Sequence, residues 1–283
     1  MPLFIGAAPV HELYHPLFEK HGVEVLIKRE DLLHEQVSGN KWRKLRYNIA
    51  AARDLGMESI LTFGGAYSNH LYATAAACSA IGFESIGVVR GDPVFPLNPT
   101  LDFAVKQGMT LHYISRGDYR RMDNNGILQK LHEQYSHAYI VPEGGSNILG
   151  IRGCMEILSE VKDQYDIVAV PCGTGATLAG LVLSLEDHQS AIGFSAMKGG
   201  DFLQENVLGH LQKVLEDPFP NHDLSKSFLI ETRYHFGGYG KYTPELAGFM
   251  LEFYNDHNIR LDPIYTAKMA FGLYDLKIGR AHV

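Results

Sequence analysis

The sequence lacks the features that mark membrane, nucleic-acid-binding and disulfide-bonded proteins. None of its apolar runs reaches membrane-spanning length, and its amino terminus has no basic stretch followed by a long apolar run. With a formal net charge of −7 and a pI near 6.0, it has no basic stripe for nucleic acid. Its 3 cysteines form no CxxC pair and no metal-ligand spacing. We therefore expect a cytoplasmic protein that acts on small molecules, with no membrane, nucleic-acid or metal partner.

The sequence does contain a regular alternation of strand-like and helix-like segments. Hydrophobic residues make up 46% of the 283 positions, which suffices for a large core and for two domains. Such alternation predicts an α/β fold with parallel sheets covered by helices on both faces. The polar segment 199–223 is predicted to be an excursion from this pattern. The predicted strands are 23–27, 59–63, 85–89, 110–114, 138–141 and 167–170, and the predicted helices are 40–55, 69–81, 101–107, 127–135 and 176–185.

Lys41 is the first candidate functional residue. It lies in the first turn of the predicted helix 40–55, for which Ser38 is the expected cap and Gly56 the expected stop. The positive end of the helix dipole and the neighbouring cations Arg43–Lys44 all disfavour an ammonium ion at this position. A neutral amine is the form that a Schiff base requires. The alternative is one of several solvated cations on a basic helix face.

The junction Gly173–Thr177 connects a predicted strand to a predicted helix. Two glycines leave the backbone amides accessible at the helix start, and two threonines add hydroxyl groups, which together favour a phosphate site. The segment is neither a Walker A loop nor a GxGxxG dinucleotide motif. The alternative is a tight turn in which the glycines serve packing alone.

Two further glycine-rich junctions precede predicted helices. In the first, Ser68, Asn69 and His70 follow Gly64–Gly65. Ser68 is a good helix cap, but a helix start with free amides beside such side chains can also bind a carboxylate. The second junction, Glu143–Asn147, is equally compatible with a turn and with a functional site.

Taken together, five motifs resemble one enzyme family. They stand in the order seen in pyridoxal-phosphate enzymes of fold type II, the tryptophan synthase β fold. Within that fold the chain resembles the group of 1-aminocyclopropane-1-carboxylate deaminase and D-cysteine desulfhydrase, from near residue 5 to about residue 276. The motifs are Lys28-Arg29-Glu30-Asp31-Leu32, Ser38-Gly39-Asn40-Lys41, Gly64-Gly65 with Ser68-Asn69-His70, Gly173-Thr174-Gly175-Ala176-Thr177 and Leu261-Asp262-Pro263-Ile264-Tyr265-Thr266.

The resemblance implies a domain organisation and a cofactor. It implies two three-layer αβα domains with parallel sheets and with pyridoxal 5′-phosphate bound between them. The larger domain would comprise residues 1–42 and 153–276, and the smaller domain residues 43–152. It also implies a homodimer and a small amino-acid substrate.

The resemblance also assigns roles to individual residues. Lys41 would hold the pyridoxal aldehyde as a Schiff base and then act as base or acid at the substrate α-carbon. Ser68, Asn69 and His70 would surround the substrate carboxylate, with Ser68 among the catalytic residues and Asn69 also close to the cofactor. The cofactor phosphate would be bound by Gly173, Thr174, Gly175, Ala176 and Thr177.

Tyr239 and Tyr265 match the two tyrosines that line the family's site, and both are expected to be catalytic. Packing against neighbours is the alternative for each. Thr266 follows Tyr265 and would meet the pyridine nitrogen, where the ring-opening deaminase has a glutamate. A neutral hydroxyl there implies a weaker electron sink than a carboxylate does.

This difference favours α,β-elimination from D-cysteine, giving pyruvate, ammonia and sulfide. Three alternatives stay open. One is 1-aminocyclopropane-1-carboxylate deaminase activity, and another is an amino-acid racemase on the same scaffold. The third is a catalytically impaired, truncated binding protein.

The carboxyl-terminal residues 278–283 break the family pattern. The family continues beyond residue 276 with another strand and a His-Thr-Gly-Gly-like turn. Here the chain ends Ile-Gly-Arg-Ala-His-Val, which the common sequencing-adaptor DNA ATCGGAAGAGCACACGTC encodes in one frame. We therefore expect these six residues to be a non-native tail on a truncated carboxyl terminus.

Overall fold

The computed structural model describes residues 6–122, 126–161, 165–216 and 228–276. The chain forms two compact units. Unit 1 comprises Met1–Ala7 and Glu30–Gly153, and unit 2 comprises Ala8–Arg29 and Cys154–Val283. Residues 30–42, which the resemblance places in the larger domain, group with unit 1. The domain boundaries at residues 42 and 153 stay a prediction, as does the tail 278–283, which lies outside the described residues.

Unit 1 is built on a four-stranded parallel sheet with the strand order β5-β4-β3-β6. In this register Ser59 pairs with both Glu84 and Ala138, so three strands begin at the same level. The carboxyl ends of all four strands therefore lie at one edge of the sheet, where Gly64–Gly65 ends β3. The strands are β3 (Ser59–Gly65), β4 (Glu84–Arg90), β5 (Met109–Ile114) and β6 (Ala138–Val141).

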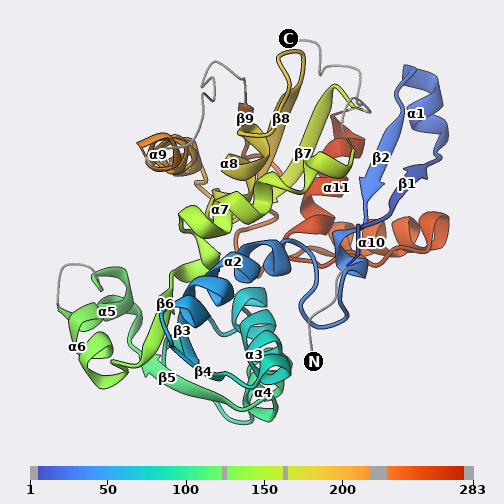
Figure 1. The fold of residues 1–283 in the computed structure, drawn as a ribbon. Helices are drawn as coiled ribbons and strands as arrows, with labels where there is room; N and C mark the ends of the chain where they lie inside the picture. The colour runs from blue at the N-terminus through green and yellow to red at the C-terminus, as the bar shows by residue number, and fades with distance from the viewer. Residues whose placement is uncertain (1–5, 123–125, 162–164, 217–227, 277–283) are drawn as a thin grey trace. The chain divides into compact units, whose positions relative to one another are not determined.

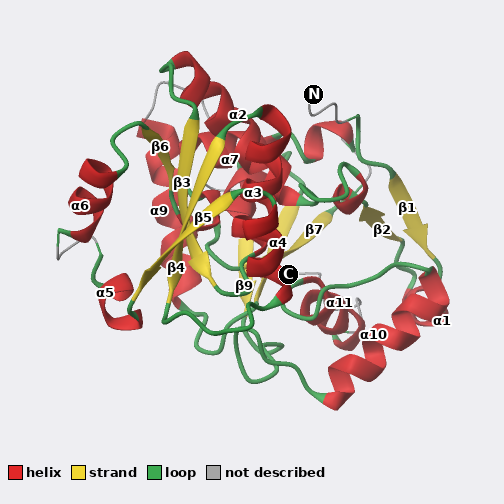
Figure 2. Ribbon diagram, turned by 90° about the horizontal axis from the view of Figure 1, so that it is seen from below, coloured by secondary structure: helices red, strands yellow, loops and turns green. Residues whose placement is uncertain are grey.

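Helices cover both faces of this sheet (Figures 1 and 2). Successive strand residues point to opposite faces, so Ile60 packs with residues of α2 and α3, whereas Leu61 and Phe63 pack with residues of α5 and α6. The sequence-based prediction of a sheet covered on both sides is confirmed for this unit. The helices are α2 (Asn40–Asp54), α3 (Asn69–Ile81), α4 (Pro99–Lys106), α5 (Arg116–Arg120) and α6 (Ile127–Gln134).

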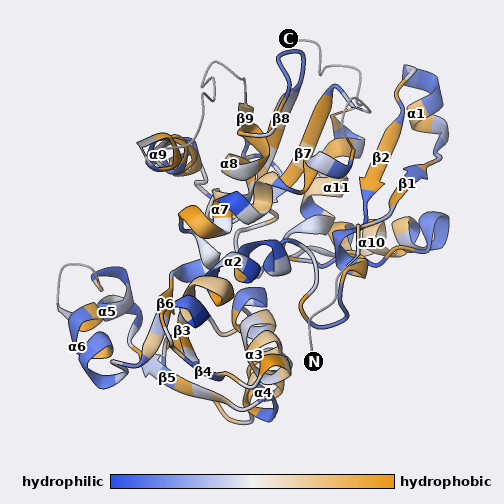
Figure 3. Cartoon of the chain, viewed as in Figure 1, coloured by the Kyte–Doolittle hydropathy of each residue, from blue (hydrophilic) through white to orange (hydrophobic). Residues whose placement is uncertain are grey.

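Unit 2 contains a three-stranded parallel sheet of order β7-β8-β9 and an antiparallel pair, β1 and β2. Residues of β1, α1, α10 and α11 share a hydrophobic cluster. Figure 3 shows β7 and β2 coloured as hydrophobic along most of their length. The strands are β1 (Val10–Leu13), β2 (Val25–Lys28), β7 (Ile167–Cys172), β8 (Ser190–Ser195) and β9 (Phe228–Glu231), and the helices are α1 (Pro16–His21), α8 (Ala176–Val182), α9 (Phe202–Glu216), α10 (Pro244–His257) and α11 (Thr266–Asp275). Between the two units in sequence, α7 spans Ile148–Met155.

The prediction of a polar excursion at 199–223 is wrong over its described part. Residues 202–216 form α9, which buries Leu203, Val207, Leu211 and Val214. These residues recur at helical spacing on one face, so the polar average of the segment concealed an apolar stripe. Residues 217–223 lie outside the described residues.

Three further facts bear on the expected class of protein. Within the described ranges, no helix is both long enough and apolar enough to cross a membrane. In the same part of the chain, no three His, Cys, Asp or Glu side chains are arranged to hold a metal ion. The thiols of Cys78, Cys154 and Cys172 are all buried.

Candidate active site

Lys41 lies in the first turn of α2, as predicted, but the cap of that helix is Gly39 and not Ser38. Gly39 has a φ of 63°, a conformation that glycine adopts without strain, and its N–H donates to the carbonyl oxygen of Glu30, 2.9 Å away. Lys41 is half-buried, and its ammonium nitrogen donates to the side-chain oxygen of Asn40 at 2.6 Å. The bond from the Gly39 N–H therefore ties the backbone before Lys41 to Glu30.

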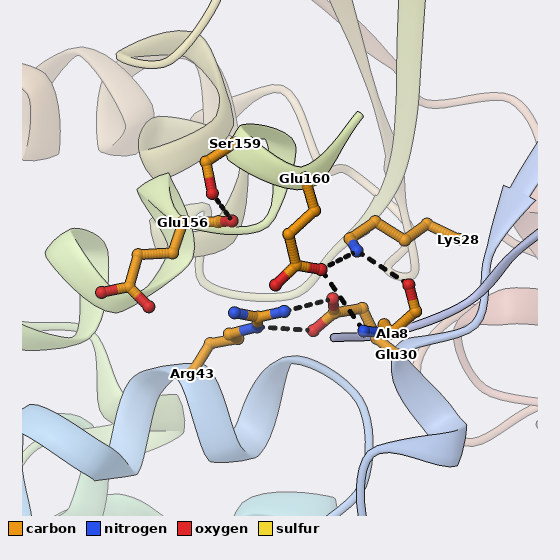
Figure 4. Close-up of polar contacts among 7 residues, drawn as sticks. All are labelled: Ala8, Lys28, Glu30, Arg43, Glu156, Ser159 and Glu160. Atoms are coloured by element: carbon orange, nitrogen blue, oxygen red, sulfur yellow. Dashed lines mark hydrogen bonds and ion pairs between the residues drawn. The ribbon is translucent and has the colours of Figure 1, made fainter. Parts of the chain in front are cut away.

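Glu30 also binds this helix through its side chain (Figure 4). The Nε and Nη2 atoms of Arg43 donate to the two carboxylate oxygens of Glu30, each over 2.9 Å. The two side chains are 6% and 13% exposed. The charge of Arg43, which we expected to act on Lys41, is balanced by this carboxylate. Glu30 thus fixes the segment that carries Lys41, a role that our reading of the motif missed.

Figure 4 also shows a polar group in unit 2, around Glu160. Its carboxylate binds the ammonium group of Lys28 and accepts from the backbone N–H of Ala8 at 3.3 Å. Lys28 donates in addition to the carbonyl oxygen of Ala8 at 3.3 Å. Lys28, the first basic residue of the motif 28–32, is therefore part of the internal structure of unit 2.

The early part of α2 is hydrophilic in Figure 3, yet several of its polar side chains are buried. Lys44 is 3% exposed and donates to the carbonyl oxygen of Gly144, 2.9 Å away. The amide of Asn48 exchanges hydrogen bonds with that of Asn147, at 3.2 and 2.6 Å. Asn147 also accepts from the N–H of Gly150 at 2.9 Å and so caps α7. The junction Glu143–Asn147 therefore has a structural role in unit 1.

The start of α3 presents hydrogen-bond donors. The Ser68 hydroxyl oxygen accepts from the N–H of Leu71 at 3.2 Å, so the predicted cap is confirmed. Among the described residues its own proton has no acceptor, and the amides of Asn69 and His70 belong to the first turn, which has no intrahelical partner. A Cβ on Gly64 would lie 2.5 Å from the Ser68 hydroxyl oxygen, so only glycine permits this approach. These donors suit a carboxylate.

His70 is held in one tautomer. Its Nε2 lies 2.9 Å from the hydroxyl oxygen of Thr62, and that hydroxyl donates its only proton to the carbonyl oxygen of Val141 at 2.7 Å. Nε2 must therefore carry a proton and donate to Thr62. Burial, followed by the charges of Lys41 and Lys44, holds the pKa of His70 well below 6.5, so the ring is neutral.

The remaining ring nitrogen, Nδ1, is consequently an acceptor. It is buried and has no hydrogen-bond partner among the described residues. An acceptor repels a carboxylate, so the backbone N–H of His70 is the group that can serve the proposed carboxylate site. At Nδ1, the imidazole can only accept a hydrogen bond in this tautomer.

In unit 2, the junction Gly173–Thr177 connects β7 to α8, with Gly175 as the cap at a φ of 85°. A Cβ on Gly175 would lie 2.9 Å from Val207 Cγ2, so both the space and the backbone conformation require glycine. His210 Nε2 lies 3.1 Å from the carbonyl oxygen of Thr174 and holds the loop against α9. Ala176 and Thr177 are buried in the first turn of α8, which ends at Val182 and not at the predicted residue 185.

This loop fits the phosphate group of pyridoxal 5′-phosphate. Its two glycines carry no side chain that would screen the backbone amides, the first turn of α8 contributes amides without intrahelical partners, and Thr174 and Thr177 add hydroxyl groups. No acidic side chain stands in the segment Gly173–Thr177. The donor set is thus appropriate for an anion.

Tyr265, Tyr239 and Thr266 also meet in unit 2. The rings of Tyr239 and Tyr265 lie edge to face, with centroids 6.0 Å apart and an interplanar angle of 71°. The hydroxyl oxygen of Thr266 accepts from the backbone N–H of Asp262 at 2.8 Å and lies 2.9 Å from its carboxylate, to which it donates. The same carboxylate accepts from the amides of Ile264, Tyr265 and Thr266. Asp262 therefore fixes the turn that presents Tyr265 and Thr266.

Comparison with known proteins places the chain among relatives of one kind. A family model described as "Pyridoxal-phosphate dependent enzyme" matches residues 1–281. The bifunctional D-cysteine desulfhydrase/1-aminocyclopropane-1-carboxylate deaminase of Arabidopsis thaliana is 30% identical over 290 residues, which cover 94% of this chain and 70% of the relative.

Two further similarities agree. A Pyrococcus horikoshii protein, named provisionally as a 1-aminocyclopropane-1-carboxylate deaminase, is 30% identical over 268 residues, covering 90% of this chain and 80% of the relative. The crystal structure of a homologue of that deaminase superposes with a TM-score of 0.84 at 27% identity, covering 98% of this chain and 86% of the other.

Proposed function

The chain belongs to the pyridoxal-phosphate-dependent enzymes of the 1-aminocyclopropane-1-carboxylate deaminase and D-cysteine desulfhydrase family, and we propose that it eliminates sulfide from D-cysteine. The reaction converts D-cysteine and water to pyruvate, ammonia and hydrogen sulfide. When bound, pyridoxal 5′-phosphate supplies the electron sink for bond breaking at the substrate α-carbon.

The environment of Thr266 is the observation that supports this choice of reaction. Thr266 stands where ring-opening relatives have a glutamate, and both its hydroxyl proton and one acceptor position are engaged by Asp262. Thr266 has no carboxylate of its own to offer the pyridine nitrogen of the cofactor. The cofactor would then be a weaker electron sink, which disfavours opening of a cyclopropane ring, whereas a good leaving group such as sulfide still departs easily.

Lys41 has two tasks in this proposal. It would hold the cofactor, and its amine would take the proton from the substrate α-carbon. The three hydrogen bonds that Glu30 accepts from this segment, one from Gly39 and two from Arg43, hold the start of α2 in place.

The start of α3 binds the substrate carboxylate. The hydroxyl of Ser68 and the amides of Asn69 and His70 converge on one helix end, where the helix dipole favours an anion. Asn69 is exposed, so its side-chain amide can also reach the substrate or the cofactor. In unit 2, Tyr239 and Tyr265 contribute phenol hydroxyls that can carry protons at the leaving group.

The test is the visible absorption spectrum with added pyridoxal phosphate, before and after borohydride reduction, for the parent chain and for Lys41→Ala. We expect the parent to show a yellow band and, after reduction, to retain the cofactor covalently. In the variant, reduction should not attach the cofactor. Lys106→Ala is the control, because the Lys106 side chain is 71% exposed and forms a surface ion pair with its helix neighbour Asp102. Fixation that survives in Lys41→Ala would mean that another lysine holds the cofactor.

The substrate is then identified by assays of pyruvate and sulfide with D-cysteine, L-cysteine and 1-aminocyclopropane-1-carboxylate. The last compound is the second candidate substrate, because the name of the Arabidopsis relative includes both activities. Ring opening faster than elimination would contradict our reading of Thr266. The homodimer is likewise a proposal, to be tested by the mass of the chain in solution.

A further inference from the structure

Lys268 is a buried lysine in α11 to which the roles above assign no task. Lys268 is 1% exposed. Its ammonium nitrogen donates to the carbonyl oxygen of Ala196 at 3.1 Å and to that of Gly238 at 2.9 Å. Both acceptors are neutral and both are distant in sequence. Lys268 thus joins α11 to the residue after β8 and to a loop that contains Tyr239.

Burying an ammonium group is costly. Burial lowers the pKa of Lys268 from 10.5, while the negative charge of Asp262 acts in the opposite direction. An unbranched apolar side chain could fill the same space without this desolvation. What lysine adds over such a side chain is the pair of hydrogen bonds to two backbone carbonyls.

One of these carbonyls belongs to the glycine loop, which we define as residues 237–240. Its glycines Gly237, Gly238 and Gly240 have φ values of 91°, 120° and 69°. Glycine at three of four positions leaves such a loop many alternative conformations. Local hydrogen bonds also stabilise the loop, from the N–H groups of Gly237 and Gly238 to His235 and from Lys241 N–H to Gly238. The bond from Lys268 reaches the loop from another element, α11.

Lys268 also stands close in sequence to the partner of Tyr239. Tyr265 immediately precedes α11, and Lys268 is three residues further along. The edge-to-face contact between the Tyr239 and Tyr265 rings therefore depends on the glycine loop keeping its position relative to the start of α11.

We propose that Lys268 is the positioning residue that holds the glycine loop on α11 and thereby keeps Tyr239 against Tyr265. This deepens the proposed function and rests on it for the role of the two tyrosines. Lys268 itself need not touch the substrate.

The first test measures the loop directly, by hydrogen exchange with mass spectrometry. In Lys268→Met, which keeps the length and removes the donors, amides of residues 236–242 should exchange at least about tenfold faster, because a charge-assisted bond is lost. Peptides of α3 should be unchanged. Lys268→Arg retains cationic donors and should restore part of the protection. Unchanged exchange in Lys268→Met overturns the proposal, and Lys268→Gln replaces that variant if it does not fold.

The second test is a double-mutant cycle on kcat for D-cysteine. Lys268→Met should lower kcat about tenfold in the parent with a smaller change in KM, but less than about twofold in the Tyr239→Phe background. An equal loss in both backgrounds overturns the proposal, because a general structural defect acts regardless of Tyr239. If the parent does not turn over D-cysteine, the proposed function fails, and hydrogen exchange alone decides the role of Lys268.

Discussion

The ring of Tyr265 lies against Gly173, so that a Cβ at position 173 would come within 3.2 Å of its Cε1 and 3.3 Å of its hydroxyl oxygen. The proposed phosphate loop and the proposed tyrosine site are thus in direct contact.

We expect Gly173→Ala to weaken binding of pyridoxal phosphate by about tenfold, because the added methyl group displaces Tyr265 or the loop. A titration of the chain with the cofactor, followed by absorption, measures the effect. Gly209→Ala is the matched control, since a Cβ on Gly209 of α9 meets no atom within 4 Å. Equal affinities for both variants would show that the loop tolerates the displacement.

Glu30→Gln should destabilise unit 1 by about 3 kcal/mol, because it removes the carboxylate charge that pairs with the largely buried guanidinium of Arg43. Unfolding in urea measures the change. Asp102→Asn removes a carboxylate from the exposed Lys106 pair and should cost less than about 1 kcal/mol. Similar losses for the two variants would contradict a stabilising role of the buried pair.

His70 should make stability depend on pH. Because burial and nearby cations depress its pKa in the folded chain, the unfolded chain binds more protons once the pH falls below 6.5. The free energy of unfolding should therefore fall as the pH drops from about 7 toward the folded pKa, by up to about 1.4 kcal/mol per pH unit, and level off below it.

His70→Gln removes this titration and keeps an N–H donor for Thr62, so its urea midpoint should fall less between pH 7 and pH 5. His257 has a lowered pKa from burial too, and its contribution of the same sign remains in both chains. The exposed His11→Gln variant is the control. Parallel pH profiles for parent and His70→Gln would rule out the neutral buried ring.

The tautomer of His70 gives a spectroscopic prediction. Ring-nitrogen shifts from NMR should show a protonated Nε2 and an unprotonated Nδ1 in the parent. Thr62→Ser keeps the hydroxyl relay to Val141 and should preserve this pattern, whereas Thr62→Val should allow a mixture of tautomers. A protonated Nδ1 in the parent would reverse our assignment of His70 as an acceptor.

The sequence predicted most of unit 1 because its signals are local. The strand 138–141 and the helix 69–81 match β6 and α3 at both ends. Both follow from short-range patterns, an apolar run and an alanine-rich segment closed by Gly82, which has a φ of 75°. In unit 2, the strands β8 and β9 and helix α9 were not predicted. The two strands are only six and four residues long, and the apolar residues of α9 recur at helical spacing among polar ones.

In the candidate site, too, some features have a local sequence signal and others have none. Residue types and spacing sufficed to select Lys41, Ser68 and the Gly173–Thr177 loop. They could not show that Glu30 balances Arg43, or that Lys268 reaches across 30 residues to Gly238. These partners are brought together by the tertiary fold, and nothing in the local sequence marks them.

The buried thiols give each compact unit an internal reporter of opening. Cys78 lies in α3 of unit 1, whereas Cys154 and Cys172 belong to unit 2. Burial raises the pKa of Cys78 to about 12, so an alkylating reagent, which needs the thiolate, should reach it only from opened states. Pulsed alkylation would therefore follow the two units separately without an added probe. Since Cys172 directly precedes Gly173, slower modification of that thiol would register a ligand on the loop.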